Sequence, residues 1–379
     1  MTARITVIIP TFNRYIYIKE CLDSIISQTH KPCQIIIVND GSNDQTPEIL
    51  KPYFKSVDYI ETNQVGKAAA LNAGLGLVNG EYVWIFDDDD VAFPDALERF
   101  AAPLESNSEY GFSYSTYLSA LTQLEDNRIG SILCESKFPD LPNQNMFIPL
   151  MERNFLGGAS LFARTDCYHR VGNFDPKLIR SEDYEMALRI SRQFTGVRVA
   201  GGPTFYYRQH QGLRGSTSDR FEAKFRSVKW LKYDQIIFRK LYHELRLADY
   251  LPTGYLLIDH VREAQLQRLA VMASKLLIPE VLECLEEFSR MEESSPFSTQ
   301  ERETLRRLVI RKPYYKTDRF YDNLEIFNKI RTLSFSSPAM RRFRRETAWV
   351  IFSALTWGKK QFNLRSWYGG VLRVMRLYA

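Results

Sequence analysis

Short apolar runs and amphipathic segments alternate through the first hundred residues of the chain. The runs are rich in Ile and Val, which is typical of strands buried on both faces of a sheet. They lie at 5–10, 33–40, 57–62 and 81–87, the third being the weakest. Apolar positions at helical spacing predict helices between them, at 17–29, 46–54 and 67–78, with Thr46 as the N-cap of the second. This alternation predicts βαβ units and a mostly parallel sheet flanked by helices.

The pattern becomes mixed after residue 100. Helices are expected at 94–106 and 181–194, and strands within 110–121, 158–164 and 197–210, the last as a strand pair. The stretch between 121 and 158 is expected to be rich in loops. From about residue 220 onward, apolar residues recur with helical periodicity, as in 227–245 and 256–277. The sequence therefore predicts an α/β domain at 1–220 and a helical C-terminal region at 221–379.

Polar clusters follow three of the predicted strands. They occupy 10–14, 39–44 and 87–90, each directly after an apolar run. The carboxyl ends of parallel strands meet at one edge of a sheet, and ligands of such sheets bind at that edge. We therefore expect the three clusters to form one site.

The cluster at 87–90 consists of four consecutive aspartates. A solvated acidic turn is the simplest interpretation, but the end of a buried strand is a poor place for one. A divalent cation such as Mg²⁺ takes carboxylate and phosphate oxygens as ligands, and Asp87 and Asp89 face the same way on an extended segment. The motif also resembles that of haloacid-dehalogenase-type phosphatases. In that family it usually follows the first strand, whereas here it follows the fourth.

Two further acidic segments have both a structural and a chemical interpretation. Asp40 follows a strand, where Asp commonly forms turns, but beside a nucleotide it could accept a base N–H or a ribose hydroxyl. Glu182 and Asp183 follow Ser181, a candidate N-cap, and acids are favoured in the first turn of a helix. Beside a sugar donor, one of these two carboxylates would act as a general base.

Taken in order, VIIPTFNR, CLDSIISQT, IIIVNDGSNDQT, GKAAALNAGL and GEYVWIFDDDD resemble the family 2 glycosyltransferases, which have the Rossmann-like GT-A fold. The resemblance covers about residues 4–100 and continues more weakly to about 215. It implies inverting, metal-dependent transfer of a sugar from a nucleotide-diphosphate donor, with UDP as the expected nucleotide. The implied acceptor is a hydroxyl of a glycan or lipid-linked saccharide, and the implied cofactor is Mn²⁺ or Mg²⁺. A catalytically inactive, sugar-binding scaffold is the alternative.

The resemblance also implies roles for individual residues. Asp183 would be the general base with Glu182 in support, and Asp89 would bind the metal, with Asp87 as the alternative. The implied contacts to the nucleotide sugar are Pro10, Thr11, Asn13, Arg14, Asp40, Lys67, Asn72, Asp87, Asp88, Arg208 and His210. Arg208 and His210 belong to a stretch that would close over the diphosphate. Apart from the resemblance, Gly157 and Gly158 either form a tight turn before a strand or line the acceptor side, because glycine permits the close approach of a ligand.

Charge is distributed unevenly along the chain. The formal net charge is +5, but residues 329–379 contain eleven Lys/Arg and one acid, so residues 1–328 carry −5. The basic residues of this tail are interleaved with Trp and Phe, a composition typical of amphipathic helices that contact anionic membranes. Packing on the protein or on a second copy of the chain is the alternative. Nucleic-acid binding is disfavoured, because the rest of the chain offers no recognisable binding module.

Cysteine usage and hydropathy bear on the compartment. The five cysteines are scattered and lack CxxC spacing, which argues against a disulfide framework or a zinc site and fits a reducing cytosol. The N-terminus does not show the pattern of a signal peptide, and no run approaches 18 apolar residues. We therefore expect a cytoplasmic protein, in peripheral contact with the inner face of the cell membrane and active in polysaccharide biosynthesis.

Overall fold

The computed structural model describes residues 3–123, 125–139, 141, 145–209, 226–252, 254–292, 295–310 and 323–357. The chain divides into two compact units. Met1–Leu150 and Asn154–Arg226 form the first, and Met151–Arg153 and Ser227–Ala379 form the second. The domain boundary expected near residue 220 falls in 210–225, outside the described residues.

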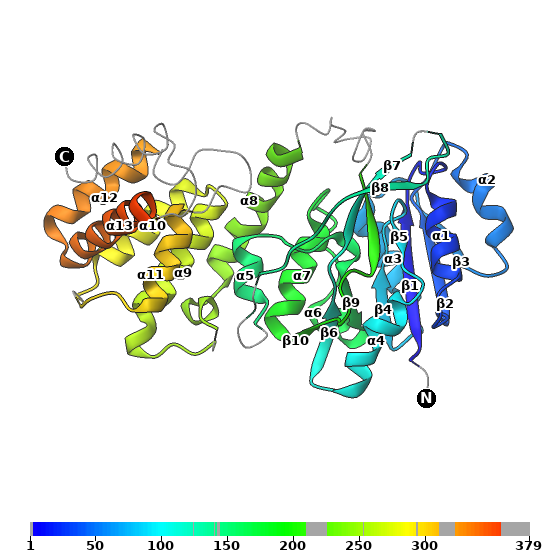
Figure 1. Ribbon diagram of the computed structural model, residues 1–379, viewed down its shortest axis with the longest axis horizontal. Coiled ribbons are helices and arrows are strands. Elements are labelled where there is room, and N and C mark those ends of the chain that lie inside the picture. Colours follow the sequence, from blue (N-terminus) through cyan, green and yellow to red (C-terminus); the bar gives the residue numbers. More distant parts are fainter. Residues whose placement is uncertain are drawn as a thin grey trace. The chain divides into compact units, whose positions relative to one another are not determined.

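Within the described residues, the first unit contains a seven-stranded sheet with the strand order β10-β6-β9-β4-β1-β2-β3 (Figure 1). Its strands are β1 (Ile5–Thr11), β2 (Gln34–Asn39), β3 (Asp58–Glu61), β4 (Tyr82–Ile85), β6 (Tyr110–Tyr114), β9 (Leu161–Arg164) and β10 (Thr195–Arg198). Neighbouring strands in this sheet are parallel, except that β9 runs antiparallel to β4 and to β6. The predicted mostly parallel sheet is confirmed.

Helices cover both faces of this sheet, as the alternating side chains of β1 show. Val7 belongs to a buried cluster with Leu22 of α1 and Phe100 of α4, whereas Ile8 lies against Gly74 of α3. A Cβ atom on Gly74 would come within 2.8 Å of Ile8 Cγ2, so only glycine allows this close packing. The helices of the first unit are α1 (Ile18–Ile26), α2 (Thr46–Leu50), α3 (Lys67–Leu75), α4 (Ala96–Ser106), α6 (Thr165–Val171) and α7 (Glu182–Gln193). Helix α5 (Phe147–Glu152) begins in the first unit and ends in residues assigned to the second.

A smaller sheet in the same unit has the order β5-β11-β7-β8. Its strands are β5 (Val91–Ala92), β7 (Leu118–Thr122), β8 (Ile129–Glu135) and β11 (Phe205–Gln209). It corrects three predictions. The stretch 110–121 forms two strands in different sheets, and β8 lies in the stretch expected to be loop-rich. The stretch 197–210 is not a strand pair, because β10 pairs with β6 while β11 pairs with β5 and β7. Local periodicity does not reveal which distant strand supplies the hydrogen bonds.

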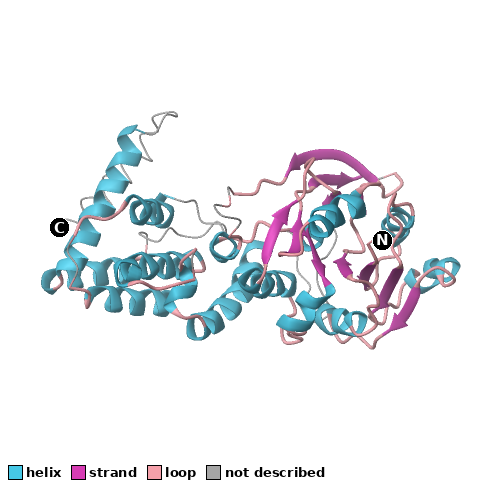
Figure 2. Ribbon diagram, turned by 90° about the horizontal axis from the view of Figure 1, so that it is seen from below, coloured by secondary structure: helices cyan, strands magenta, loops and turns pink. Residues whose placement is uncertain are grey.

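The described part of the second unit is helical, as predicted (Figure 2). Its helices are α8 (Arg226–Glu244), α9 (Val261–Ser274), α10 (Ile278–Ser289), α11 (Thr299–Ile310), α12 (Leu324–Ser336) and α13 (Pro338–Trp357). Arg262 of α9 and Glu301 of α11 form a buried ion pair with two hydrogen bonds of 2.6 and 2.8 Å. No helix in the described part of the chain is long and apolar enough to cross a membrane. Residues 358–379 of the basic tail lie outside the described residues.

Candidate functional site

Hydrogen bonds join the loops that follow β1 and β2. The backbone N–H of Asn13 donates to Ser42 Oγ, and Asn13 Oδ1 accepts the N–H of Asn43, both at 2.9 Å. Asn13 has a φ of 54°, a left-handed conformation that Asn tolerates better than most residues. The N–H of Arg14 donates to Thr46 Oγ1 at 2.9 Å. Thr46 was predicted to be the N-cap of α2, but it is the first residue of that helix, and its hydroxyl binds the β1 loop.

Arg14 connects the end of β1 to the four aspartates after β4. Its guanidinium nitrogens lie 3.4 Å from Asp88 Oδ1 and 4.0 Å from Asp89 Oδ2. Burial opposes the guanidinium charge, but Asp88 and Asp89 outweigh it and raise the pKa of Arg14. Burial also raises the pKa of Asp88 to about 7, although the Arg14 charge acts in the opposite direction. Pro10 and Thr11 are the last two positions of β1 and are buried at the same edge of the sheet.

Lys67 connects three segments of the site. It is the first residue of α3, and its Nζ lies 2.6 Å from Asp87 Oδ1 and 3.3 Å from Glu182 Oε1. Burial opposes the ammonium charge, but Asp87, Glu182 and Asp183 raise the pKa of Lys67 well above its ordinary value. The ammonium therefore stays charged and holds the end of β4 beside the start of α7.

Asp183 occupies the second position of α7. Its Oδ1 accepts the N–H of Tyr184 at 2.7 Å. Burial and the neighbouring charge of Glu182 raise the pKa of Asp183 to about 7, while Lys67 acts in the opposite direction. Ser181 is the N-cap, as predicted, but it has a φ of 58° and its side chain does not make the capping hydrogen bond. A carboxyl group with a pKa near neutrality is suited to general base catalysis.

Gly158 lies between the two acidic segments. A Cβ atom placed on it would be 2.4 Å from Asp87 Oδ2 and 3.6 Å from Asp183 Oδ2. A Cβ atom on Gly157 would instead meet the ring of Tyr117 at 3.0 Å. Gly158 thus lies close to both carboxylates, and its predicted place on the acceptor side stays a prediction.

Asp40 accepts three hydrogen bonds within the protein. Its Oδ1 accepts the Thr62 hydroxyl at 2.7 Å and the N–H of Val65 at 2.8 Å, and its Oδ2 accepts the N–H of Gly66 at 2.8 Å. Gly66 is the N-cap of α3 and has a φ of 89°, a left-handed value that favours glycine. Asp40 therefore fixes the start of the helix that carries Lys67. Its contact with a nucleotide stays a prediction.

Asn72 holds the loop that leads to α7. Its Nδ2 donates to the carbonyl of Phe174 at 2.9 Å, and its Oδ1 accepts the N–H of Phe174 at 2.8 Å. Arg189 of α7 fixes the same loop by donating to the carbonyls of Val171, Gly172 and Asn173. The predicted contact of Asn72 with nucleotide or phosphate remains untested, but its amide already has two backbone partners.

Arg208 does not lie where the sequence predicts. Its side chain has no solvent exposure, and its Nη2 donates to Glu20 Oε2 of α1 at 2.5 Å. Nη1 donates to the carbonyl of Asn127 at 2.8 Å and Nε to that of Asp89 at 2.5 Å. The guanidinium is therefore enclosed by protein and does not project toward a diphosphate, which corrects the prediction. His210 lies outside the described residues.

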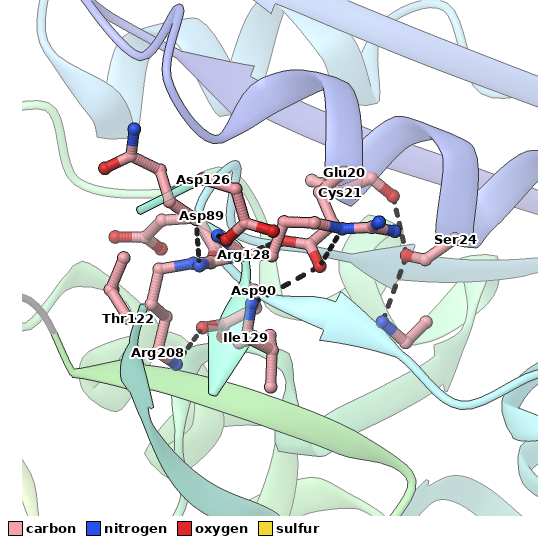
Figure 3. Close-up of polar contacts among 12 residues, drawn as sticks. Glu20, Cys21, Ser24, Asp89, Asp90, Thr122, Asp126, Arg128, Ile129 and Arg208 are labelled. Atoms are coloured by element: carbon pink, nitrogen blue, oxygen red, sulfur yellow. Dashed lines mark hydrogen bonds and ion pairs between the residues drawn. The ribbon is translucent and has the colours of Figure 1, made fainter. Parts of the chain in front are cut away.

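Sequence reasoning missed the partners of Arg208. Glu20 gave no signal, because an acidic residue in an amphipathic helix ordinarily faces solvent. Asp90 accepts the backbone N–H of Arg208 at 2.9 Å. Burial and its acidic neighbours Asp89 and Asp87 raise the pKa of Asp90 well above its ordinary value. Figure 3 shows these side chains gathered around Arg208.

The carboxylates fit a divalent cation in their chemistry. The acids of 87–90 and 182–183 outnumber Arg14 and Lys67, which form ion pairs with them. In the described part of the chain, no group of three or more His, Cys, Asp or Glu side chains is arranged to enclose a metal ion. One or two carboxylates would therefore supply the protein ligands, and phosphate oxygens and water the others, an arrangement that Mg²⁺ commonly adopts.

Known sequences include relatives of this chain. An uncharacterized glycosyltransferase of Rickettsia conorii is 30% identical over 191 residues, which cover 50% of this chain and 31% of that protein. Glycosyltransferase GlyA of Streptococcus pneumoniae is 40% identical over 123 residues, covering 30% of this chain and 18% of that protein. The chain spans less than two thirds of the length of either relative.

A solved structure has a similar fold. The complex of S. aureus TarS residues 1–349 with UDP-GlcNAc superposes with a TM-score of 0.51 and 18% sequence identity, covering 88% of this chain and 91% of that one. Residues 6–164 match the profile of the family described as glycosyl transferase family 2. This match includes β1, β2, β4, the acidic loop and Gly158. Over these residues, the chain is similar to glycosyl transferase family 2.

Proposed function

We propose that the first unit transfers a sugar, with inversion, from a nucleotide-diphosphate donor to a hydroxyl of a glycan or lipid-linked acceptor. The observation that carries this proposal is the bridge from Lys67 to both Asp87 and Glu182. It brings an acidic loop at a strand end, where diphosphates bind in such sheets, beside Asp183, whose pKa is raised to about 7. The proposed donor site and the proposed base are therefore neighbours.

Asp183 would be the base. Its carboxylate takes the proton of the acceptor hydroxyl while that oxygen bonds to the anomeric carbon and the bond from that carbon to the diphosphate breaks. Attack opposite the leaving diphosphate inverts the anomeric configuration. Glu182 supports the base by sharing Lys67 with Asp87, and Gly158 leaves room beside both acidic segments.

Asp89, or alternatively Asp87, would hold a divalent cation. When bound, Mn²⁺ or Mg²⁺ neutralises the negative charge that develops on the leaving diphosphate. Arg14 keeps Asp88 and Asp89 in place from the β1 side. The backbone and side chains of Pro10, Thr11, Asn13 and Arg14 would contact the nucleotide at this edge, with Asp40 fixing the loop before α3.

The relatives suggest which ligands to test first. The TarS structure contains UDP-GlcNAc, which makes UDP the first nucleotide to test. Chondroitin synthase of Pasteurella multocida is 26% identical over 191 residues, covering 49% of this chain and 19% of that protein. Its name supports a glycan as the acceptor and polysaccharide biosynthesis as the setting.

Calorimetry with UDP, GDP and dTDP, each with Mn²⁺ or with EDTA, tests the proposal. We expect one nucleotide, with UDP the first candidate, to bind more tightly with Mn²⁺ than with EDTA. Asp183→Asn should retain this binding and lose sugar transfer. Equal binding of every nucleotide with and without Mn²⁺ would rule out the metal-dependent donor site.

Two alternatives predict different results. A phosphatase would release phosphate from phosphomonoesters and would not need a nucleotide sugar, but its motif would be expected on the first strand and here it follows β4. An inactive scaffold would bind the donor, and neither hydrolysis nor transfer would follow in the presence of acceptor. Donor turnover measured by release of UDP separates both from the proposed transferase.

The second unit supports a separate proposal, peripheral contact with the anionic inner face of the cell membrane by a cytoplasmic protein. On α13, Arg341, Arg345 and Trp349 are exposed at helical spacing, and Trp349 is 60% exposed. Glu346 is turned inward and pairs with Arg302 at 3.0 Å, so this face is basic.

Vesicle sedimentation tests this second proposal. The protein should pellet with vesicles of anionic lipid, and Arg345→Glu should lower the fraction retained in the pellet. Equal retention by neutral vesicles would contradict the proposal, and light scattering without lipid would detect the alternative, a homo-oligomer.

A further inference from the structure

A buried arginine contacts two consecutive residues of the acidic loop. Arg208 Nε donates to the carbonyl of Asp89 at 2.5 Å, and the backbone N–H of Arg208 donates to Asp90 Oδ1 at 2.9 Å. These contacts come from opposite parts of one residue, its guanidinium and its own peptide. Because β11 also pairs with β5 directly after the loop, Arg208 lies at the point where the loop joins the small sheet.

The guanidinium is fixed by three other partners. Nη2 donates to Glu20 of α1, Nη1 donates to the carbonyl of Asn127, and the ring of Tyr17 lies 4.8 Å from the guanidinium carbon. Each guanidinium nitrogen therefore has an acceptor, and the planar group has one orientation (Figure 3). Lysine could keep the charge opposite Glu20, but a single ammonium cannot reach all three acceptors in these directions.

This geometry defines the position of Asp89. Its carbonyl accepts a hydrogen bond from Arg208, while its carboxylate lies 4.0 Å from Arg14 Nη2. Four adjacent carboxylates repel one another, so an unsupported loop would open and lose its geometry. We propose that Arg208 is a positioning residue, which holds the peptide of Asp89 so that the acidic loop is formed before a metal ion or donor arrives.

The effect on metal binding rests on the proposed function, whereas the positioning of the Asp89 peptide does not. Outer partners that orient metal ligands typically change metal affinity by about 10- to 100-fold when they are removed. We therefore expect Arg208→Lys to raise the Mn²⁺ concentration at half-saturation of UDP binding by about tenfold or more. UDP binding in EDTA should remain unchanged, because the nucleotide contacts proposed at the end of β1 do not involve Arg208.

Arg99→Lys is the matched control. Arg99 also holds a backbone turn through its guanidinium, donating to the carbonyls of Ala200, Gly202 and Pro203 at 2.8 to 2.9 Å. A purely structural loss at Arg99 should lower the melting temperature without changing the Mn²⁺ midpoint. If Arg208→Lys behaves in the same way, Arg208 is structural and the proposal fails.

Hydrogen exchange provides a readout that does not depend on the function. The Asp90 amide donates to the Asp87 carbonyl at 3.2 Å within the loop. In metal-free protein, Arg208→Lys should accelerate exchange in a peptide that covers residues 86–92, and Arg99→Lys should not. Unchanged exchange would overturn the proposal even if the protein bound no nucleotide, whereas absent nucleotide binding by the wild type would refute the proposed function alone. If Arg208→Lys does not fold, Glu20→Gln provides the same comparison, with a smaller acceleration expected.

Discussion

The ammonium of Lys67 donates a hydrogen bond of 2.6 Å to the Asp87 carboxylate. The same ammonium lies 3.3 Å from Glu182. A single cation thus joins the acidic loop after β4 to the first turn of α7, two segments that are distant in sequence. The site depends on this contact because it balances carboxylates that would otherwise repel each other.

Lys67→Met should separate the two acidic segments. Removing the ammonium leaves Asp87 and Glu182 facing each other without the cation that they share, so we expect lower stability at pH 7 and loss of sugar transfer. Thermal unfolding and UDP-release assays measure the two effects. Lys51→Met is the control, since Lys51 pairs with Glu48 where both side chains are more than 60% exposed. An equal change in both variants would contradict the bridging role of Lys67.

Asp183→Asn should lose sugar transfer and have a higher melting temperature than wild type at alkaline pH. The pKa of Asp183 is raised from 3.8 to about 7, so the folded protein binds more protons than the unfolded chain between these values. Its contribution to stability is present below the lower value and is lost as the pH rises through the upper one. Asn cannot ionise, so the variant should melt at a higher temperature than wild type at pH 8 and show little difference at pH 4.

The rate of transfer should follow the same ionisation. Because the base acts as a carboxylate, the rate constant of the wild-type enzyme should rise with pH through about 7. Asp183→Asn should show no such rise in its residual activity. A pH-independent rate for the wild type between pH 5.5 and 8.5 would exclude Asp183 as the base of the rate-limiting step.

Gly158→Ala should disturb the site through one methyl group. The added Cβ would lie 2.4 Å from Asp87 Oδ2, too close for any real contact, so the carboxylate that binds Lys67 must move. We expect about a tenfold or greater loss of kcat, since displacements of about 1 Å at catalytic groups have effects of this size. Gly76→Ala is the control, because its Cβ would meet its nearest neighbour at 3.5 Å. Full activity in Gly158→Ala would show that Asp87 is free to move.

Asn72→Ala distinguishes two roles of one side chain. If Asn72 clamps Phe174, its replacement should lower the free energy of unfolding by about 1–3 kcal/mol. It should also lower kcat and accelerate hydrogen exchange in residues 172–181. As a nucleotide contact, it should instead weaken UDP binding. Calorimetry and exchange on the same protein decide between them, and unchanged values in both would remove Asn72 from the site.

Much of the fold could be predicted because its signals are local. The apolar runs of β1, β2 and β4 and the amphipathic α1 depend on neighbouring residues, and the rule that ligands bind at the carboxyl ends of parallel strands brought three polar clusters to one edge. The second sheet could not be predicted in this way, because β8 has no buried position and its pairing with β7 is not encoded by a period within either strand.

The sequence by itself determined the class of fold, the family resemblance and the set of polar residues at the strand ends. Only the tertiary structure decided which partners those residues have within the protein. Asp40 is engaged by Thr62, Asn72 by Phe174 and Arg208 by Glu20, which is 188 positions away. A polar residue in a loop looks the same in sequence whether it faces a ligand or a distant backbone group. The difference arises from hydrogen-bond partners that only the folded chain brings within reach.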